Sequence, residues 1–194
     1  MLRSRVKLTL AAAVLGVGGF TAAAVAGGGG NDFETDLNGF EEVPSVSTVA
    51  GAEVRAEVNR AGTELRYRLR YRNLEGTVQQ SHIHLGQEGV NGGIVVFLCS
   101  NLGNGPAGTP PCPPENPGTV SGTLDAADVS AVPASAPAVA QGIAAGEFAE
   151  LIRAMRAGVT YANVHSTKFP AGEVRGQLDG EHDGEHDEEH DDDD

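Results

Sequence analysis

The sequence lacks the short motifs that mark most hydrolases and nucleotide-binding proteins. It contains no G-x-S-x-G and no H-E-x-x-H motif, and its serine residues have no evident histidine partner. No glycine-rich loop is followed by the lysine that a phosphate-binding loop requires. These absences argue against hydrolase chemistry and against phosphate binding by a glycine loop.

Cysteine is scarce, with only Cys99 and Cys112 in the chain. The two do not form a C-x-x-C pair, so a metal or redox role is the weaker interpretation for them. The segment between them is rich in glycine and proline, and a cross-link would restrict it in the unfolded chain. We therefore expect a disulfide between Cys99 and Cys112, as is usual in an oxidising compartment.

A hydrophobic run long enough to span a membrane comfortably is also missing. Basic residues precede an apolar run at residues 8–20, and Ala24-Val25-Ala26 follows, which is the order of a secretory signal peptide. We expect residues 1–26 to be a cleaved signal, with a retained membrane anchor as the alternative, and residues 27–32 to be a flexible joint. The expected location is secreted, periplasmic or at the cell surface.

The net charge of -14 is unevenly distributed along the chain. Eleven of the 27 acidic residues lie within residues 179–194, so the rest of the chain carries about -3. Residues 33–178 are expected to form one domain, and residues 179–194 a disordered acidic tail because like charges repel. A domain that is not strongly charged is not expected to bind nucleic acid, and an extracellular ligand or protein is the expected partner.

Alternation of apolar and polar residues predicts a mostly β domain. Residues 65–72 alternate leucine or tyrosine with arginine, which is typical of a half-buried strand, and residues 54–58 should pair with them as a hairpin. Further strands are expected at residues 33–40, 79–85, 93–98, 118–124, 160–165 and 173–178. The predicted fold class is all-β, an antiparallel Greek-key-like sandwich or barrel with one short helix.

The one helix is expected at residues 147–157. Its apolar residues form a single stripe at helical spacing, and Gly158 stands where a C-cap belongs. We interpret the stripe as core packing rather than as a binding face.

Three histidines are the strongest candidates for chemistry. His82 and His84 are two residues apart on an expected strand, so their side chains leave the same face, and Asn163 and His165 share a face on a later strand. If the two strands are neighbours, the three imidazoles converge, and neutral imidazole is a suitable ligand for copper or zinc. The alternative is that these histidines only hydrogen-bond to loops at the sheet edge.

Several segments of the sequence resemble the CHRD domain, the module repeated in chordin and found singly in many secreted bacterial proteins. They are LNGFEEVP at residues 37–44, SHIHLG at 81–86, GVNGG at 89–93, YANVHS at 161–166 and GEVRGQL at 172–178. The segments occur in the family's order, and the resemblance covers residues 33–178. It implies a binding or structural module without an agreed activity, and the growth-factor antagonism of chordin does not carry over.

A looser resemblance connects the histidines with copper-zinc superoxide dismutase. That enzyme also has an H-x-H strand, a later lone histidine and a downstream arginine on a β-barrel, and His82, His84, His165 and Arg175 follow that order. The resemblance implies a metal site with Arg175 in its surroundings, and Asn163 is expected there too because it shares a strand face with His165. Because no histidine is suited to bridging two metals, a mononuclear copper site is the stronger form of this idea.

The acidic tail repeats a Glu-His unit every four residues and contains His182, His186 and His190. Imidazole beside carboxylate is a weak chelator of divalent metals, so the tail could raise the local metal concentration. A purely solubilising tail is the alternative.

An arginine row is the other charged feature. Arg66, Arg68, Arg70 and Arg72 could attract an anionic ligand or the acidic tail, or they could form a solvated face that nearby glutamates balance across strands.

Together these observations favour a secreted, non-enzymatic CHRD-type binding module with a candidate copper or zinc site at His82, His84 and His165. Two alternatives stay open. One is a copper-dependent enzyme resembling superoxide dismutase, which needs an open coordination position. The other is a metal-free cell-surface structural or adhesion module, whose sign would be an exposed apolar patch beside the sheet edge.

Overall fold

The computed structural model describes residues 30–129 and 141–180. The expected signal peptide, the first part of the joint and residues 181–194 of the tail lie outside this part of the chain. The described residues form β1 (Asp32–Asn38), η1 (Gly39–Glu41), β2 (Gly51–Val58), β3 (Leu65–Arg72), β4 (Val78–Leu85), β5 (Gly93–Ser100), β6 (Gly118–Leu124), α2 (Phe148–Arg156), β7 (Thr160–Ser166) and β8 (Val174–Gly180).

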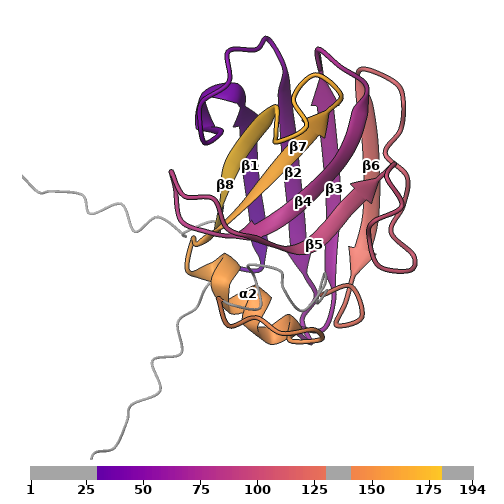
Figure 1. The fold of residues 1–194 in the computed structure, drawn as a ribbon. Helices are drawn as coiled ribbons and strands as arrows, with labels where there is room; N and C mark the ends of the chain where they lie inside the picture. The colour runs from indigo at the N-terminus through magenta and orange to yellow at the C-terminus, as the bar shows by residue number, and fades with distance from the viewer. Residues whose placement is uncertain (1–29, 130–140, 181–194) are drawn as a thin grey trace, which may run out of the picture.

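The eight strands form one antiparallel sheet in the order β5-β4-β7-β8-β1-β2-β3-β6. The sheet curls into a nearly closed barrel, with β5 and β6 facing each other across the remaining seam (Figure 1). The Tyr67 hydroxyl on β3 donates to the Leu98 carbonyl on β5 at 2.6 Å, which ties the two ends of the sheet together. The predicted all-β class with one short helix is confirmed.

Strict alternation explains why β2 and β3 pair as predicted. Along β3 every leucine and tyrosine is buried and every arginine is exposed, so one face of the strand supplies the core and the other meets solvent. A hydrogen bond from the Gly62 amide to the Asn59 carbonyl stabilises the turn between the two strands. Gly62 has a φ of 70°, a conformation that favours glycine.

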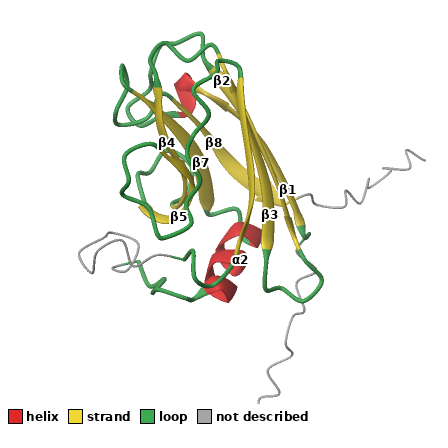
Figure 2. Cartoon of the chain, turned by 90° about the vertical axis from the view of Figure 1, so that its right-hand side faces the viewer, coloured by secondary structure: helices red, strands yellow, loops and turns green. Residues whose placement is uncertain are grey.

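Helix α2 closes one end of the barrel (Figures 1 and 2). Its buried stripe belongs to the same hydrophobic core as the strands, which confirms the packing interpretation; it consists of Phe148, Leu151, Ile152 and Met155. Gly158 follows with a φ of 65°, as a left-handed C-terminal residue does. No helix in the described residues is long and apolar enough to cross a membrane.

Several predicted boundaries are wrong: β2 begins at Gly51 and not at residue 54, β5 ends at Ser100 and not at residue 98, and the ends of β1 and β8 also differ. The strand expected at residues 33–40 ends at Asn38, because the Asn38 side chain accepts hydrogen bonds from the amides of Phe40 and Glu41 and so caps a short 3-10 helix. The tail was expected to begin at Asp179, but β8 continues to Gly180, which pairs with Phe33 on β1. Backbone pairing with β1, which acidic composition does not predict, extends the strand.

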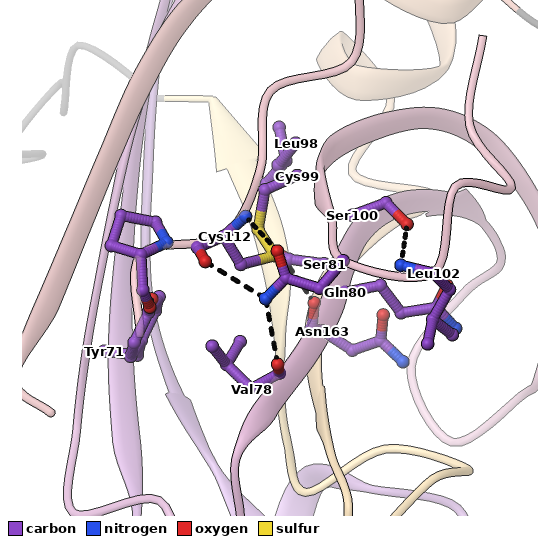
Figure 3. Close-up of a disulfide and its surroundings, with 12 residues drawn as sticks. Tyr71, Val78, Gln80, Ser81, Leu98, Cys99, Ser100, Leu102, Cys112 and Asn163 are labelled. Atoms are coloured by element: carbon purple, nitrogen blue, oxygen red, sulfur yellow. Dashed lines mark hydrogen bonds between the residues drawn. A yellow bond between two sulfur atoms is a disulfide. The ribbon is translucent and has the colours of Figure 1, made fainter. Parts of the chain in front are cut away.

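Cys99 and Cys112 form the predicted disulfide (Figure 3). The cross-link anchors the glycine- and proline-rich segment to β5, and Asn101 completes the attachment. The Asn101 side chain donates to the Val78 and Cys112 carbonyls at 3.1 and 3.0 Å and accepts from the Cys112 amide at 3.0 Å. The segment is therefore held against β4 and β5 at the seam of the barrel.

Replacing both cysteines, as C99S/C112S, should lower the free energy of unfolding by about 3 kcal/mol, because the disulfide restricts a short loop in the unfolded chain. Urea unfolding with and without reductant measures this. Reductant should destabilise the wild-type chain and leave the double variant unchanged; equal stability of the two oxidised proteins would contradict the prediction.

Candidate functional site

The antiparallel pairing of β4 with β7 brings the three predicted histidines together. His82 faces Asn163, His84 faces Tyr161, and His165 lies opposite Gln80 in the register of the two strands. One nitrogen from each imidazole lies within 4.8 Å of the others, and all three side chains are buried. The expected convergence of His82, His84 and His165 is confirmed.

The histidine cluster lies on the face of the sheet turned away from the core. Ile83, Ala162 and Val164 alternate with the clustered residues along the two strands, and all three belong to the hydrophobic core. The cluster is nevertheless sheltered, since His82 is 0% and His84 only 7% exposed. Residues 39–44, 86–92 and 167–172 supply the neighbouring loop groups on this side of the barrel.

Backbone carbonyls orient two of the three imidazoles. The His84 Nδ1–H donates to the Gly92 carbonyl and the His165 Nδ1–H donates to the Pro170 carbonyl, each at 3.0 Å. In a neutral ring this leaves the Nε2 lone pair available, which is how most metal-bound histidines are held. The Asn163 side-chain amide borders the cluster 3.1 Å from the His84 Nε2, and a neutral His84 accepts there from the NH2 group of the amide, whose oxygen and nitrogen positions are interchangeable.

Three nitrogen atoms of the cluster are buried without a hydrogen-bond partner among the described residues. They are Nδ1 and Nε2 of His82 and Nε2 of His165. The His82 ring instead meets the edge or face of other rings, with Phe97 at 4.4 Å and His165 at 5.0 Å between centroids. Buried polar atoms normally have partners, so an unpaired set in one place needs a physical explanation.

Burial keeps the three imidazoles neutral. It lowers the pKa of His84 to about 4 and that of His82 well below 6.5, where the neighbouring imidazoles add to the effect. The pKa of His165 is also lowered, again by burial. At neutral pH the lone pairs are therefore free of protons, as a metal ligand requires.

Arg175 stacks beside the cluster rather than opening toward solvent. Its guanidinium lies 3.4 Å from the centroid of Tyr161, whose ring in turn stacks on His84 at 4.6 Å. Nη2 donates to the Gln87 and Val90 carbonyls at 3.1 and 3.0 Å. Arg175 is 1% exposed, so it holds the loop over the site and does not present a charge to an incoming anion.

Glu42 is a neighbour that the sequence analysis missed. Its carboxyl is buried, which raises its pKa to about 7 against the opposing influence of the Arg175 charge. Gly172 makes room for it with a φ of 135°, since a Cβ there would lie 2.3 Å from the carboxyl oxygen. An acidic residue inside a conspicuous apolar and glycine segment, LNGFEEVP, was the available signal.

Tyr161 and Gly92 were also missed as parts of the site. The Gly92 amide donates to the Tyr161 hydroxyl at 3.1 Å, while its carbonyl accepts from His84. A side chain at Gly92 would place its Cβ 1.6 Å from the Leu85 carbonyl oxygen, so only glycine fits. The pair of glycines in GVNGG indicated a close backbone approach, but not its target.

The other predicted site residues lie apart from the cluster. Arg66, Arg68, Arg70 and Arg72 are exposed in one row on β3, on the outward side of a different sector of the sheet. His182, His186 and His190 lie outside the described residues. Neither the anion-binding role of the row nor the metal-binding role of the tail is tested by these positions.

The chain was compared with known families, curated proteins and solved structures. The family model described as "CHRD domain" matches residues 33–178. No curated protein and no solved structure matches the chain. The match covers all eight strands apart from the first residue of β1 and the last two of β8.

The metal-free protein should lose thermal stability as the pH falls from 7 to 5. Because the folded-state pKa values of the three histidines lie below the unfolded value near 6.5, unfolding takes up protons, and stability falls with pH below that value. Calorimetry in the presence of a chelator measures the change in Tm.

Glu42 provides a control of opposite sign. Its pKa is raised to about 7 in the folded protein, so its contribution to stability is present at low pH and is lost as the pH rises through 7. The variant E42Q removes this opposing contribution and should show a steeper loss of Tm between pH 7 and 5. A wild-type Tm that does not fall over this interval would contradict the histidine prediction.

Proposed function

The chain belongs to the CHRD family, and we propose that it is an exported, non-enzymatic binding module that holds one copper or zinc ion with His82, His84 and His165. The family membership supports a binding module in general terms. The disulfide is consistent with export, because such bonds persist in oxidising compartments. The metal assignment depends on the histidine cluster.

The observation that carries the proposal is the set of unpaired, neutral imidazole nitrogens in one buried place. An unsatisfied buried polar atom costs about 1–3 kcal/mol, and three such atoms belong to this cluster. A bound cation would satisfy Nε2 of His165 and one nitrogen of His82 together. The Nδ1–H bonds of His84 and His165 to backbone carbonyls already match the arrangement around known metal ligands.

The three imidazoles need to move only a short distance to coordinate one metal ion. Metal–nitrogen distances of about 2.0–2.1 Å place the ligand nitrogens of a tetrahedral site about 3.4 Å apart. The ligand atoms lie within 4.8 Å of one another, so side-chain adjustment by about 1 Å would bring them to coordination distance. Three nitrogen ligands and no thiolate favour copper or zinc over magnesium and calcium, which prefer oxygen.

The two alternatives have less support. Superoxide is an anion, and Arg175 is buried against loop carbonyls instead of being exposed to attract one. An adhesion surface would require a contiguous apolar patch. The large apolar side chains exposed in the described residues lie on three separate loops, and they are Phe40, Val49, Val90 and Leu102.

One metal ion per chain should bind tightly to a full-length variant whose tail histidines are replaced, H182N/H186N/H190N. Adding His82→Phe to this variant should weaken binding by about 100-fold or more, since even the loss of an outer-shell partner costs 10–100-fold. Titration calorimetry with Cu(II) and Zn(II), together with metal analysis, measures both quantities.

Phenylalanine is the matched replacement because His82 already packs against Phe97 in an apolar setting. An unchanged Tm for the His82→Phe protein in chelator would show that the fold is retained. Equal metal affinity with and without His82 would refute the site, and superoxide consumption above that of free copper would favour the enzyme instead.

Copper should displace zinc from this site. The Irving–Williams order places Cu(II) above Zn(II) for nitrogen ligands. Dialysis of the tail-substituted protein against equal amounts of both ions, followed by metal analysis, should recover mainly copper. Retention of zinc would indicate that the loops impose a geometry that copper does not accept.

A further inference from the structure

The outward side of β1, β2 and β3 separates its charges by strand. β1 presents the acids Asp32, Glu34 and Asp36, while β3 presents only arginines, and β2 between them is mixed. Arg55 on β2 is already paired with Glu34 at 2.7 Å and with Glu53. The basic charge of this side therefore concentrates in the β3 arginine row, Arg66, Arg68, Arg70 and Arg72.

The arginine row has no ion-pair partner among the described residues, whose ion pairs all involve other cations. On its far side β6 places Thr119, Ser121 and Thr123 opposite the row, which are hydroxyls without charge. On its near side Arg66, Arg68 and Arg70 lie opposite Glu57, Arg55 and Glu53. Neither glutamate forms an ion pair with the row in the described residues, so the guanidinium groups of the row stay available to an anionic partner.

The spacing of the row selects an extended acidic peptide. Alternate residues on a strand are about 6.7 Å apart, so the row repeats a guanidinium at that interval. In residues 181–194 every odd position from Glu181 to Asp193 is acidic. An extended chain of that sequence would present carboxylates on one side at the same interval, and would turn His182, His186 and His190 to the other side.

The tail also begins at the right place. Gly180 pairs with Phe33, which pairs with Ala56, which pairs with Tyr67 between the first two arginines of the row. That separation is three strand spacings, or about 14 Å. Residues 181–194 can extend about 46 Å, so the tail can reach Arg66 and still continue along the row to Arg72.

The surface is hollowed along this path. One hollow spans β1, β2 and β3 beside Phe33 and reaches Arg66 and Arg68, and a second one adjoins it and reaches Arg70. The two hollows share Arg55 and Arg68. Together they extend from Phe33 on β1, the pairing partner of Gly180, to Arg70 in the arginine row.

We propose that residues 181–194 of this chain dock in extended form along the β3 arginine row of the same molecule. The carboxylates at odd positions pair with the guanidinium groups, and the tail histidines face solvent. The tail is thereby held on a sector of the barrel distinct from the β4 and β7 strands that carry the three-histidine cluster. This inference is independent of whether that cluster binds metal.

Cleavage of the tail in the full chain tests the proposal. A glutamate-specific protease is applied in chelator, at about 0.01 M salt, where charges act over about 30 Å, and at about 1 M, where they act over about 3 Å. The cleavage rate is divided by that of a free peptide of residues 181–194 in the same buffer. We expect about threefold or greater protection of the tail at low salt and none at high salt.

Charge variants identify the surface responsible. R66Q/R68Q/R70Q/R72Q should abolish the protection, whereas R60Q/R153Q/R156Q, which removes exposed positive charge elsewhere, should retain it. Equal protection in both variants, or no protection in the wild type, would overturn the proposal. Protection that grows with protein concentration would also overturn it, since the row would then bind the tail of a second copy.

Discussion

The antiparallel pairing of β4 with β7 is the constraint on which the rest of the site depends. One set of residues on these strands enters the core and the alternate set forms the histidine cluster, so a single register fixes both. A slip of one residue would move Ile83 out of the core and His82 into it, because successive side chains point to opposite faces. The apolar core thus enforces a polar arrangement that is itself costly.

The outward loops turn this exposed arrangement into a buried one. Each loop contributes groups that the cluster uses: Gly92 and Pro170 supply carbonyls to the imidazoles, and Glu42 supplies a carboxyl. Arg175 fastens one loop by bonds to its carbonyls and packs its charge against Tyr161. The cation and the buried carboxyl lie on the same side of the sheet, so the site gains shelter from water without an excess of one charge.

The sequence was sufficient to predict the features that depend on the spacing of apolar residues and on local chemistry. Alternation predicted β3 and its hairpin, helical spacing predicted the core stripe of α2, and the positions of His82, His84 and His165 predicted a shared face. The sequence did not predict the parts of the site that depend on contacts between loops distant in sequence. Nothing local indicates that Glu42 approaches residues about 130 positions later, or that Gly92 must lack a side chain because of Leu85.

Boundaries failed for a related reason. The end of β1 is set by an Asn38 side chain that competes for backbone amides, and the end of β8 by the availability of a partner on β1. Acidic composition therefore placed the end of the folded domain at Leu178, two residues before β8 ends. The β-propensity of a segment depends on its own residues, whereas the end of a strand depends on where the neighbouring strand no longer provides backbone hydrogen bonds.

Because side chains alternate between the two faces of each strand, one barrel can carry different polar groups on different parts of its outer face. The inner face is mainly apolar, although it includes buried Ser81 and Thr160. The outer face can therefore present imidazoles on β4 and β7 and guanidinium groups on β3 without changing the core. Ten of the 27 acidic residues lie beyond β8, in residues 181–194. Acids placed around the barrel instead would have added self-repulsion to the folded state and neutralised the arginine row. Concentrating these acids beyond β8 limits repulsion among the charges of the barrel and leaves the arginine row free to pair with them.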